Sequence, residues 1–497
     1  MPRRWFLLLV AVGLLVTGCT GAHDGSGRSL AGGAPHAGVG SGAAGRAGTA
    51  ATSLGSDGVR AAWVRRENAR PGTTAWRIPP HASGAISGFA DRVYAADGQR
   101  VSLYVSSRAP SFHVEAYRMG YYGGAGARLV WRSGQRRGTV QPPCPRTAGT
   151  NMVACDNWKP SLSLVLGKDF LQGDYLFKLV GNGGQQSYVP LTVWDPDSHA
   201  GYVVKNDVLT WQAWNPYGGY DYYVGQGSCP PGVYPLCSRA RVVSFDRPYG
   251  DAQGTGDFLA LELPLVEFLE QHGLDVSYAT DLTLIQHPGF LSRHKALLSL
   301  GHDECWDLAE RQAAVAAERH GMNIAFFGAS PILRHVRAQP SPLGAHREVV
   351  DYRDSAADPF DGQGNPLNVT GNTWGSPPAS WPESDFVGEM YAGFLEPGAP
   401  QAAFVVADAT AWLFAGTGAH DGTTVPRVIA SDADGFDPTS HPADLQILGH
   451  SPVPIADSQA HGRHWGPVYY SDMTYYTDTF SKAGVFDSGT NNWIPDL

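Results

Sequence analysis

The apolar residues change their spacing near residue 200, and this change limits what each part of the chain can fold into. Before it, short runs such as 101–105 alternate apolar and polar residues, with turn residues between them, which is typical of a β-sandwich. After it, helical spacing at 308–320 follows a strand-like run at 295–300, which predicts a parallel sheet covered by helices. We therefore expect an α+β multidomain protein, with a β-sandwich domain at 59–196 and an α/β domain at 197–497.

The run 258–272 also has helical spacing and is followed by Gly273, a fitting residue just past a helix end. Pro264 lies inside this run, where a proline removes a helical hydrogen bond. We therefore expect either a late start or a kink in this helix.

Residues 1–18 have the three parts of a secretory signal. Arg3 and Arg4 carry positive charge, an apolar run follows, and small residues lead to Cys19. The apolar run is too short for a permanent span, which needs about 20 residues. We expect export through the general secretory route or, given the arginine pair, the twin-arginine route.

Cys19 resembles the lipobox cysteine of bacterial lipoproteins. The resemblance implies diacylglycerol on its sulfur, cleavage before it, and acylation of the new amine, as by palmitate. Two or more chains hold a protein stably on a membrane, so we expect localisation on the extracytoplasmic face of the cell membrane. The alternative is an ordinary signal peptide with an incidental cysteine. Residues 19–58 are rich in Gly, Ala and Ser, which predicts a disordered tether to the lipid.

The charge of the chain is mildly negative, with a formal net charge of −10. The sequence contains no run of lysine and arginine residues. Binding to a phosphate backbone depends on such basic clusters, so we expect no nucleic-acid partner.

The remaining cysteines form two local pairs and a single residue. Cys144 lies near Cys155, and Cys229 lies near Cys237, each in a segment with proline and glycine. In an exported chain such pairs predict disulfides, and neither pair has the CxxC form of a zinc site. Cys305 is left without a partner and is expected to be free.

Several segments together match one known family. They are Arg65–Asn68 with Pro71–Thr73, Tyr117–Gly124, Thr210–Asn215, Val243–Tyr249, Gly301–Glu304 and Gly484–Gly489. This set resembles bacterial proteins whose C-terminal domain is similar to the large subunit of N,N-dimethylformamidase. The resemblance covers about residues 60–497 and is specific as a set, although each segment alone is weak.

The resemblance implies an immunoglobulin-like sandwich followed by an α/β domain related to the class I glutamine-amidotransferase fold. It also implies hydrolysis of an amide C–N bond at one non-haem iron, held by two tyrosines and a glutamate. A small second subunit accompanies the characterised enzyme, and whether this chain has one is left open.

The segment Gly301–Cys305 is expected to be a tight turn between the strand at 295–300 and a helix from Trp306 onward. Ligands of open parallel sheets bind at such turns, and His302 and Glu304 alternate so that both can face one site. A carboxylate there can bind a metal or take a proton. The alternative is that Asp303 or Glu304 only stabilises the first helical turn. The resemblance favours the site, because Glu304 matches the glutamate ligand and His302 the neighbouring histidine.

The two tyrosine ligands of the family have no match in this chain. The corresponding segments contain Trp211, Trp214 and Phe245, and neither an indole nor a phenyl ring can ligate iron. Four tyrosines in a nearby loop are candidates for a substitute ligand, or for packing and sugar binding: Tyr217, Tyr220, Tyr222 and Tyr223. Ser330 and Asp432 match a polar and an acidic residue of the family site, and Asp434 lies beside Asp432. We expect the cleft to be lined by Trp211 or Trp214, by Phe245 or Asp246, and by Ser330 and Asp432.

Three further residues, Cys305, Asp246 and Arg247, invite a functional interpretation. Cys305 on a strand-to-helix turn could act as a nucleophile, since helix N-termini lower thiol pKa values, but buried free cysteine is more often a core residue. Asp246 and Arg247 could line the cleft or form one structural ion pair. We favour the core role for Cys305 and leave both alternatives open for Asp246 and Arg247.

These residues support three functions. The first is a metal-assisted hydrolase of amide C–N bonds outside the membrane, with a small amide or envelope substrate and Glu304, His302, Ser330 and Asp432 at its site. The second is a catalytically degenerate protein that binds cell-envelope glycans through the tyrosine-rich loop. The third is a thiol hydrolase that acts through Cys305.

Overall fold

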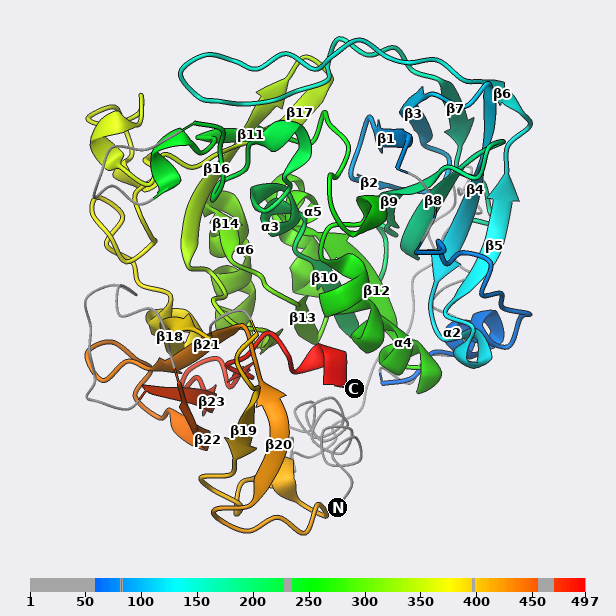
Figure 1. Ribbon diagram of the computed structural model, residues 1–497. Coiled ribbons are helices and arrows are strands. Elements are labelled where there is room, and N and C mark those ends of the chain that lie inside the picture. Colours follow the sequence, from blue (N-terminus) through cyan, green and yellow to red (C-terminus); the bar gives the residue numbers. More distant parts are fainter. Residues whose placement is uncertain are drawn as a thin grey trace, which may run out of the picture.

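The computed structural model describes residues 59–80, 82, 84–227, 235–395, 398–454 and 469–496. The predicted signal, Cys19 and the predicted tether lie outside these residues. Strands in several sheets make up most of the regular structure, and the helices are few and short (Figure 1). No helix among the described residues has both the length and the apolar character needed to cross a membrane.

The first part of the chain forms two sheets that face each other. A three-stranded sheet has the order β1-β3-β7, and a larger one has the order β2-β9-β8-β4-β5, with β6 paired to β4. The strands are β1 (Ile86–Ala90), β2 (Tyr94–Ala95), β3 (Arg100–Ser107), β4 (Ser111–Met119), β5 (Ala127–Arg132), β6 (Arg136–Arg137), β7 (Leu162–Val165), β8 (Gly173–Gly181) and β9 (Gln186–Val193). Apolar residues of both sheets form one buried cluster, because alternate residues of each strand point inward.

The later part is built on a seven-stranded sheet of order β12-β10-β13-β15-β24-β23-β22. Neighbouring strands from β12 to β24 are parallel, and the last two are antiparallel. The strands are β10 (Tyr202–Asn206), β12 (Val276–Thr280), β13 (Ala296–Leu300), β15 (Asn323–Phe327), β22 (Gln446–Val453), β23 (Tyr469–Thr477) and β24 (Gly484–Asp487). The parallel strands are almost wholly buried, as expected for strands with both faces covered.

Five helices pack around these sheets. They are α2 (Ala62–Asn68), α3 (Val208–Ala213), α4 (Leu263–Gln271), α5 (Asp281–Gln286) and α6 (Leu308–Arg319). Pro264 is the second residue of α4, and a π-helical turn at Phe258–Glu262 precedes it, so the predicted run begins late as a regular helix. Gly273 has a positive φ of 65° directly past its end.

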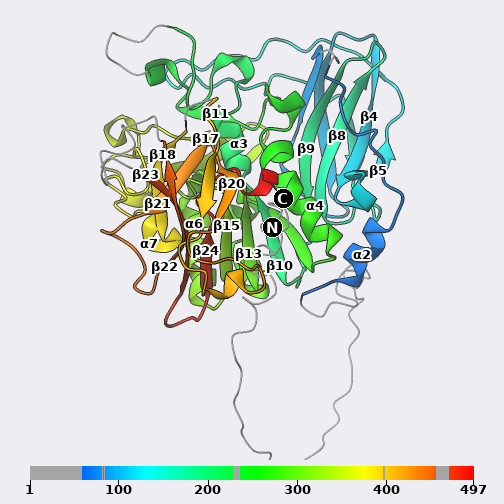
Figure 2. The same cartoon turned by 60° about the horizontal axis from the view of Figure 1, so that its bottom comes forward.

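Smaller sheets complete the later part (Figure 2). One has the order β11-β17-β16-β14, and two others are the pairs β18-β21 and β19-β20. The strands are β11 (Val242–Ser244), β14 (Cys305–Asp307), β16 (Arg334–Ser341), β17 (Gly344–Val350), β18 (Glu389–Phe394), β19 (Ala402–Val405), β20 (Thr424–Ile429) and β21 (Asp432–Phe436); a short helix α7 (Ser384–Val387) precedes β18.

A buried ion pair joins the sandwich to the seven-stranded sheet. Arg118 of β4 donates to both carboxylate oxygens of Glu270 in α4, at 2.6 and 3.0 Å. Tyr278 of β12 donates to the same carboxylate at 2.8 Å. All three side chains are fully buried, so the contact holds the two parts against each other.

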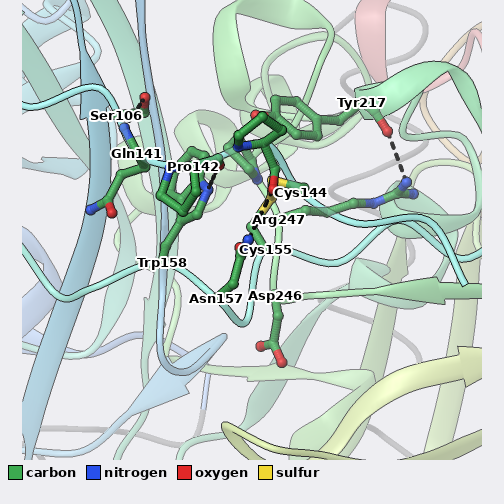
Figure 3. Close-up of a disulfide and its surroundings, with 12 residues drawn as sticks. Ser106, Gln141, Pro142, Cys144, Cys155, Asn157, Trp158, Tyr217, Asp246 and Arg247 are labelled. Atoms are coloured by element: carbon green, nitrogen blue, oxygen red, sulfur yellow. Dashed lines mark hydrogen bonds between the residues drawn. A yellow bond between two sulfur atoms is a disulfide. The ribbon is translucent and has the colours of Figure 1, made fainter.

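The predicted disulfide between Cys144 and Cys155 is confirmed, and it closes the loop that reaches toward β11 (Figure 3). The amide of Cys155 donates to the carbonyl of Asp246, so the disulfide loop contacts the later part of the chain. Cys237 is also disulfide-bonded, while Cys229 lies outside the described residues, so its pairing with Cys237 stays a prediction. Cys305 is free, as predicted.

Candidate active site

The turn after β13 lies where the strand order of the parallel sheet reverses. Strand β10 precedes β12 and β13 in the chain but lies between them in the sheet. The segments after β10 and β13 therefore leave the sheet side by side, on opposite sides of a crevice at its carboxyl edge. The first segment carries Trp214, at the end of α3, and the second carries His302 and Glu304.

Two glycines allow the turns after β13 and β15 to touch. Gly301 has a φ of 63°, a left-handed conformation that disfavours other residues. A Cβ atom on Gly328 would lie 1.6 Å from the carbonyl oxygen of Gly301, so only glycine fits there. This close approach brings Ser330, two residues further on, to the turn that holds His302. Ser330 itself has a φ of 61°, and such strained residues cluster at functional sites.

Glu304 is buried and surrounded by hydrogen-bond donors. Nε1 of Trp214 lies 3.2 Å from Oε2, and Nε of Arg334 lies 3.2 Å from Oε1. The hydroxyl of Tyr223 lies 2.5 Å from both oxygens. Nε2 of His302 lies 3.5 Å from Oε2. These contacts occupy the carboxylate oxygens of Glu304 from several elements of the fold.

His302 lies between two carboxylates. Its Nε2 is 3.5 Å from Glu304 and 3.7 Å from Oδ2 of Asp432. Burial opposes a charge on the imidazole, but the two carboxylates outweigh it and raise the pKa of His302 to about 10. The imidazole is therefore protonated at neutral pH.

The other ring nitrogen of His302 has partners for both protonation states. Asn491 accepts from the amide of Ala329 through Oδ1 at 2.8 Å, which turns its NH₂ group toward Nδ1 of His302 at 3.0 Å. The carbonyl oxygen of Ala329 lies 3.2 Å from the same nitrogen. A neutral ring can accept from Asn491, and a protonated ring can donate to Ala329, so the site tolerates loss and gain of a proton.

Asp432 begins β21 and is held by Ser330. The hydroxyl of Ser330 donates to Oδ2 of Asp432 at 2.9 Å, and its amide donates to Asp434 at 2.7 Å. Burial raises the pKa of the Asp432 carboxyl, and the positive charge of His302 opposes that rise. Because its proton is held by Asp432, the Ser330 hydroxyl is a support for this carboxylate within the cluster.

The two carboxylates differ in acidity. Burial would raise the pKa of Glu304, but the hydrogen bond from His302 and the charges of His302, Arg334 and Arg353 hold it well below its usual range. Glu304 therefore stays ionised as a counter-ion. Asp432 has a raised pKa and a side chain 20% exposed, so it is the carboxylate that solvent and a substrate can reach.

Trp214 forms the open wall of the cluster. The residue is 39% exposed, and its indole stacks on the ring of Tyr223, with ring centroids 3.6 Å apart. The ring of His302 lies 6.0 Å from it. His302, Glu304, Ser330, Asp432 and Trp214 are thus brought together.

Trp211 and Phe245, two of the alternative wall residues, lie elsewhere. Trp211 is buried and donates to Asp207 and Glu262. Trp211 and Phe245 line a separate cavity of about 30 Å³ beside the sandwich. Of the alternatives Trp211 or Trp214, the structure brings Trp214 to Glu304, because α3 turns Trp211 toward the sandwich.

The pair Asp246 and Arg247 also serves the structure, although not as one ion pair. Asp246 accepts from Arg347 and Ser341. Arg247 donates to the backbone carbonyl of Tyr217, as Figure 3 shows, and to those of Asn215 and Tyr220, which shapes the loop before Tyr223. Of the two alternatives left open, a structural role is therefore found, with bonds to more distant residues in place of one ion pair between neighbours.

Within the tyrosine-rich loop, the side chain of Tyr223 reaches Glu304. The hydroxyl of Tyr222 donates to the carbonyl of Val349, and the ring of Tyr220 lies under Arg146. The loop therefore contributes one phenol to the site and uses two other tyrosines for packing.

The predicted start of a helix at Trp306 is wrong, and this changes the interpretation of two residues. Cys305–Asp307 is the short strand β14, and Asp307 caps α6 through the amide of Ala309. Glu304 therefore caps no helix. Cys305 is fully buried away from a helix N-terminus, and burial raises the pKa of its thiol, so the core role is favoured over the nucleophile.

The residues around Glu304 do not fit an iron site of the kind that the resemblance implies. Trp214 and Arg334 direct N–H groups at the carboxylate, and these are donors that cannot ligate a metal. Tyr223 is the phenol in contact, and its hydroxyl donates to both oxygens of Glu304. Within the described ranges, no three His, Cys, Asp or Glu side chains are grouped so that they could hold a metal ion.

Three further residues belong to the cluster. Arg334 begins β16 and donates to Glu304. Asn491, after β24, contacts His302. Asp257 precedes the π-helical turn, where its side chain makes no capping bond, and burial raises its pKa to about 6 against the charge of His302. They lie 30 to 189 positions from their partners, so local sequence patterns carried no signal for them.

The comparison with protein families gives one result. A family model described as "N,N-dimethylformamidase beta subunit-like, C-terminal" matches residues 113–497. No curated protein matches the chain. The match includes every residue of the cluster described above.

Proposed function

Since the chain belongs to the N,N-dimethylformamidase beta subunit-like family through residues 113–497, we propose that it hydrolyses amide C–N bonds at the cluster of His302, Glu304 and Asp432. One observation carries the proposal. A histidine lies within 3.7 Å of two carboxylates of unlike acidity, and one of these carboxylates is accessible to solvent. This is an arrangement for transferring protons.

Asp432 is the general base in the proposed reaction, and His302 is the general acid. A water molecule beside Asp432 gives it a proton, and the water oxygen bonds to the acyl carbon. Nε2 of His302 gives its proton to the amide nitrogen as the C–N bond breaks, which releases a carboxylic acid and an amine. The 3.7 Å separation of Nε2 and Oδ2 then allows Asp432 to return a proton to His302.

The other residues position these two groups. Glu304 stays ionised and fixes His302 through charge, while Tyr223, Trp214 and Arg334 hold Glu304. Ser330 orients Asp432. Iron enters no step of this proposal, because the donors around Glu304 do not fit it.

Purified protein should release amine from at least one member of a panel of simple amides, including N,N-dimethylformamide, formamide and acetamide. Replacing the base, Asp432→Asn, should lower kcat by about 10²- to 10⁴-fold. His302→Asn should do the same. Asp97→Asn removes an exposed carboxylate from the sandwich and serves as the matched control, with activity unchanged.

Activity of Asp432→Asn equal to that of the unaltered protein would refute the assigned base. A complete lack of hydrolysis across the panel, together with binding of envelope glycans, would favour the second candidate, a catalytically degenerate glycan-binding protein. The exposed indole of Trp214 beside the cluster is the observation that keeps this candidate in view.

We also propose the finer features that the sequence implies. The two facing sheets would be an immunoglobulin-like domain at 59–196, and 197–497 a class I glutamine-amidotransferase-like domain. The chain would be held on the extracytoplasmic face of the membrane by lipid on Cys19. Cys19→Ala should move the protein from the membrane fraction to the soluble fraction or leave it unprocessed; a processed, membrane-bound variant would refute the anchor. A small second subunit remains a possible partner by analogy with the family.

A further inference from the structure

Trp214 and Tyr223 form an aromatic stack at the exposed side of the cluster, and Tyr223 is held rigidly in it. Trp214 stacks on Tyr223 with an interplanar angle of 13°, and the guanidinium carbon of Arg353 lies 4.4 Å from the centre of the same tyrosine ring. A ring and a guanidinium at these distances cannot share one face, so they cover opposite faces of Tyr223. The hydroxyl of Tyr223 is held by Glu304, which fixes the stack in its plane.

Trp214 itself is only partly covered. The residue is 39% exposed although one face of its indole is stacked, whereas Trp211, three residues earlier, is buried. An indole is large and mostly apolar, and leaving it exposed loses the free energy of burial. Because it is held in place before anything binds, a flat ligand would lose little conformational entropy from this side chain on stacking there.

The cluster next to Trp214 contains a hydrogen-bond acceptor that is partly exposed. The carboxylate of Asp432 is 20% exposed and lies 3.7 Å from Nε2 of His302, whose ring centre lies 6.0 Å from that of Trp214. An aryl ring on Trp214 would leave this acceptor without a donor. A pyranose ring suits it better, because its C–H face packs on an indole while its hydroxyl groups donate outward.

We infer that the substrate class is an N-acylated amino sugar, whose ring packs on Trp214 while its amide reaches His302 and Asp432. The inference rests on the proposed amide hydrolysis and adds the substrate to it. Water adds through its oxygen to the acyl carbon, the bond from that carbon to the sugar nitrogen breaks, and the nitrogen takes a proton from His302. The products are acetate, for an N-acetyl sugar, and the free amino sugar.

The test uses a β-1,4-linked trimer of N-acetylglucosamine as the probe. Its binding is followed by tryptophan fluorescence and calorimetry, and its hydrolysis by release of acetate. Acetamide, which has an amide without a ring, and a glucose trimer, which has rings without an amide, are the comparison ligands. We expect the N-acetylglucosamine trimer to bind more tightly than either and to be deacylated.

Substitutions at Trp214 separate stacking from its bond to Glu304. Trp214→Ala removes both and should weaken trimer binding by about three- to tenfold. Trp214→Phe keeps an aromatic face without the N–H group and should bind the trimer better than the alanine variant. Phe480→Ala removes an aromatic side chain that is 94% exposed, in a loop with no contact to the cluster, and should bind as the unaltered protein does.

The outcomes distinguish the inference from the proposed function. Hydrolysis of acetamide without binding of the trimer would overturn the substrate class and leave the amide hydrolase standing. Trimer binding that depends on Trp214 without any hydrolysis would support the ring-binding surface and overturn the hydrolase. Equal binding of the glucose trimer would overturn recognition of the acyl group.

Discussion

One turn of the chain carries two buried charged networks that face opposite ways. Asp303 points to Lys205, while His302 and Glu304 on either side of it point to Asp432 and Trp214. Both networks contain several carboxylates grouped around a cationic side chain, Lys205 in one and His302 in the other. They differ in whether water can reach them.

The network around Lys205 is sealed. Its ammonium group contacts the carboxylates of Asp281, Asp303 and Glu310, and all four side chains are at most 2% exposed. Trp306 covers the ammonium group, at 4.6 Å from its ring centre. The cluster links β10, α5, the turn after β13 and α6, so its role is to stabilise the fold.

The network around His302 is open at one side. Asp432 and Trp214 are partly exposed, and Nδ1 of the imidazole has one partner that suits a neutral ring and one that suits a protonated ring. Buried charge alone therefore does not mark a functional site. A route for substrate and a group that can change its protonation state are also required.

Breaking the sealed network around Lys205 should have the largest effect, a loss of stability. Lys205→Met removes the one cation and leaves three buried carboxylates without compensation. We expect the free energy of unfolding to fall by about 3–5 kcal/mol, measured by denaturant unfolding. Lys168→Met removes an exposed lysine and should change it by less than about 0.5 kcal/mol. Equal stability of the two variants would contradict the structural role.

Raising the pH should separate the two networks. The pKa of His302 is raised from 6.5 to about 10, so its contribution to stability is complete below pH 6.5 and is lost as the pH passes 10. Amide hydrolysis should fall about tenfold per pH unit above pH 10, because the general acid is lost. The pKa of Lys205 is raised well above 10.5, so the sealed network stays charged in this range. A fall in activity centred near pH 6.5 would contradict the coupling of His302 to its carboxylates.

Removing iron with a chelator should have the smallest effect on stability and activity. Because donors already occupy Glu304, we expect less than stoichiometric iron in the purified protein. A chelator should leave both the melting temperature and the hydrolytic activity unchanged. About one iron per chain, lost in Glu304→Ala, would instead restore the metal-assisted mechanism.

Patterns that repeat over short distances were predicted well. The run at 308–320 is the helix α6, and the strand-like run at 295–300 is β13, because burial sets the spacing of apolar residues. The family resemblance is confirmed by the match over residues 113–497. The helix start at Trp306 was wrong, because Cys305–Asp307 pairs with β16, a strand about thirty residues further along the chain.

The partners of Glu304 could not be predicted from local sequence patterns. Both Trp211 and Trp214 were candidates for the site, and four tyrosines were equally plausible. Only packing selects among them: α3 buries Trp211 against Glu262 and turns Trp214 to Glu304, and Arg247 shapes the loop that delivers Tyr223. Side chains three positions apart share a face only inside a helix, and Trp214 is the cap residue just past the last residue of α3, so the end of this short helix decides where its indole points.

The sequence by itself determined the kinds of elements, the turn that holds His302 and Glu304, and the family, since these depend on local periodicity and on residues adjacent in the chain. Tertiary structure decided which charges meet. His302 meets Asp432 and Asn491 across 130 and 189 positions, and Lys205 meets Asp303 across 98. The physical reason is that charge interactions act through space and strengthen where water is excluded, so their strength and partners exist only once the sheet has brought distant strand ends together.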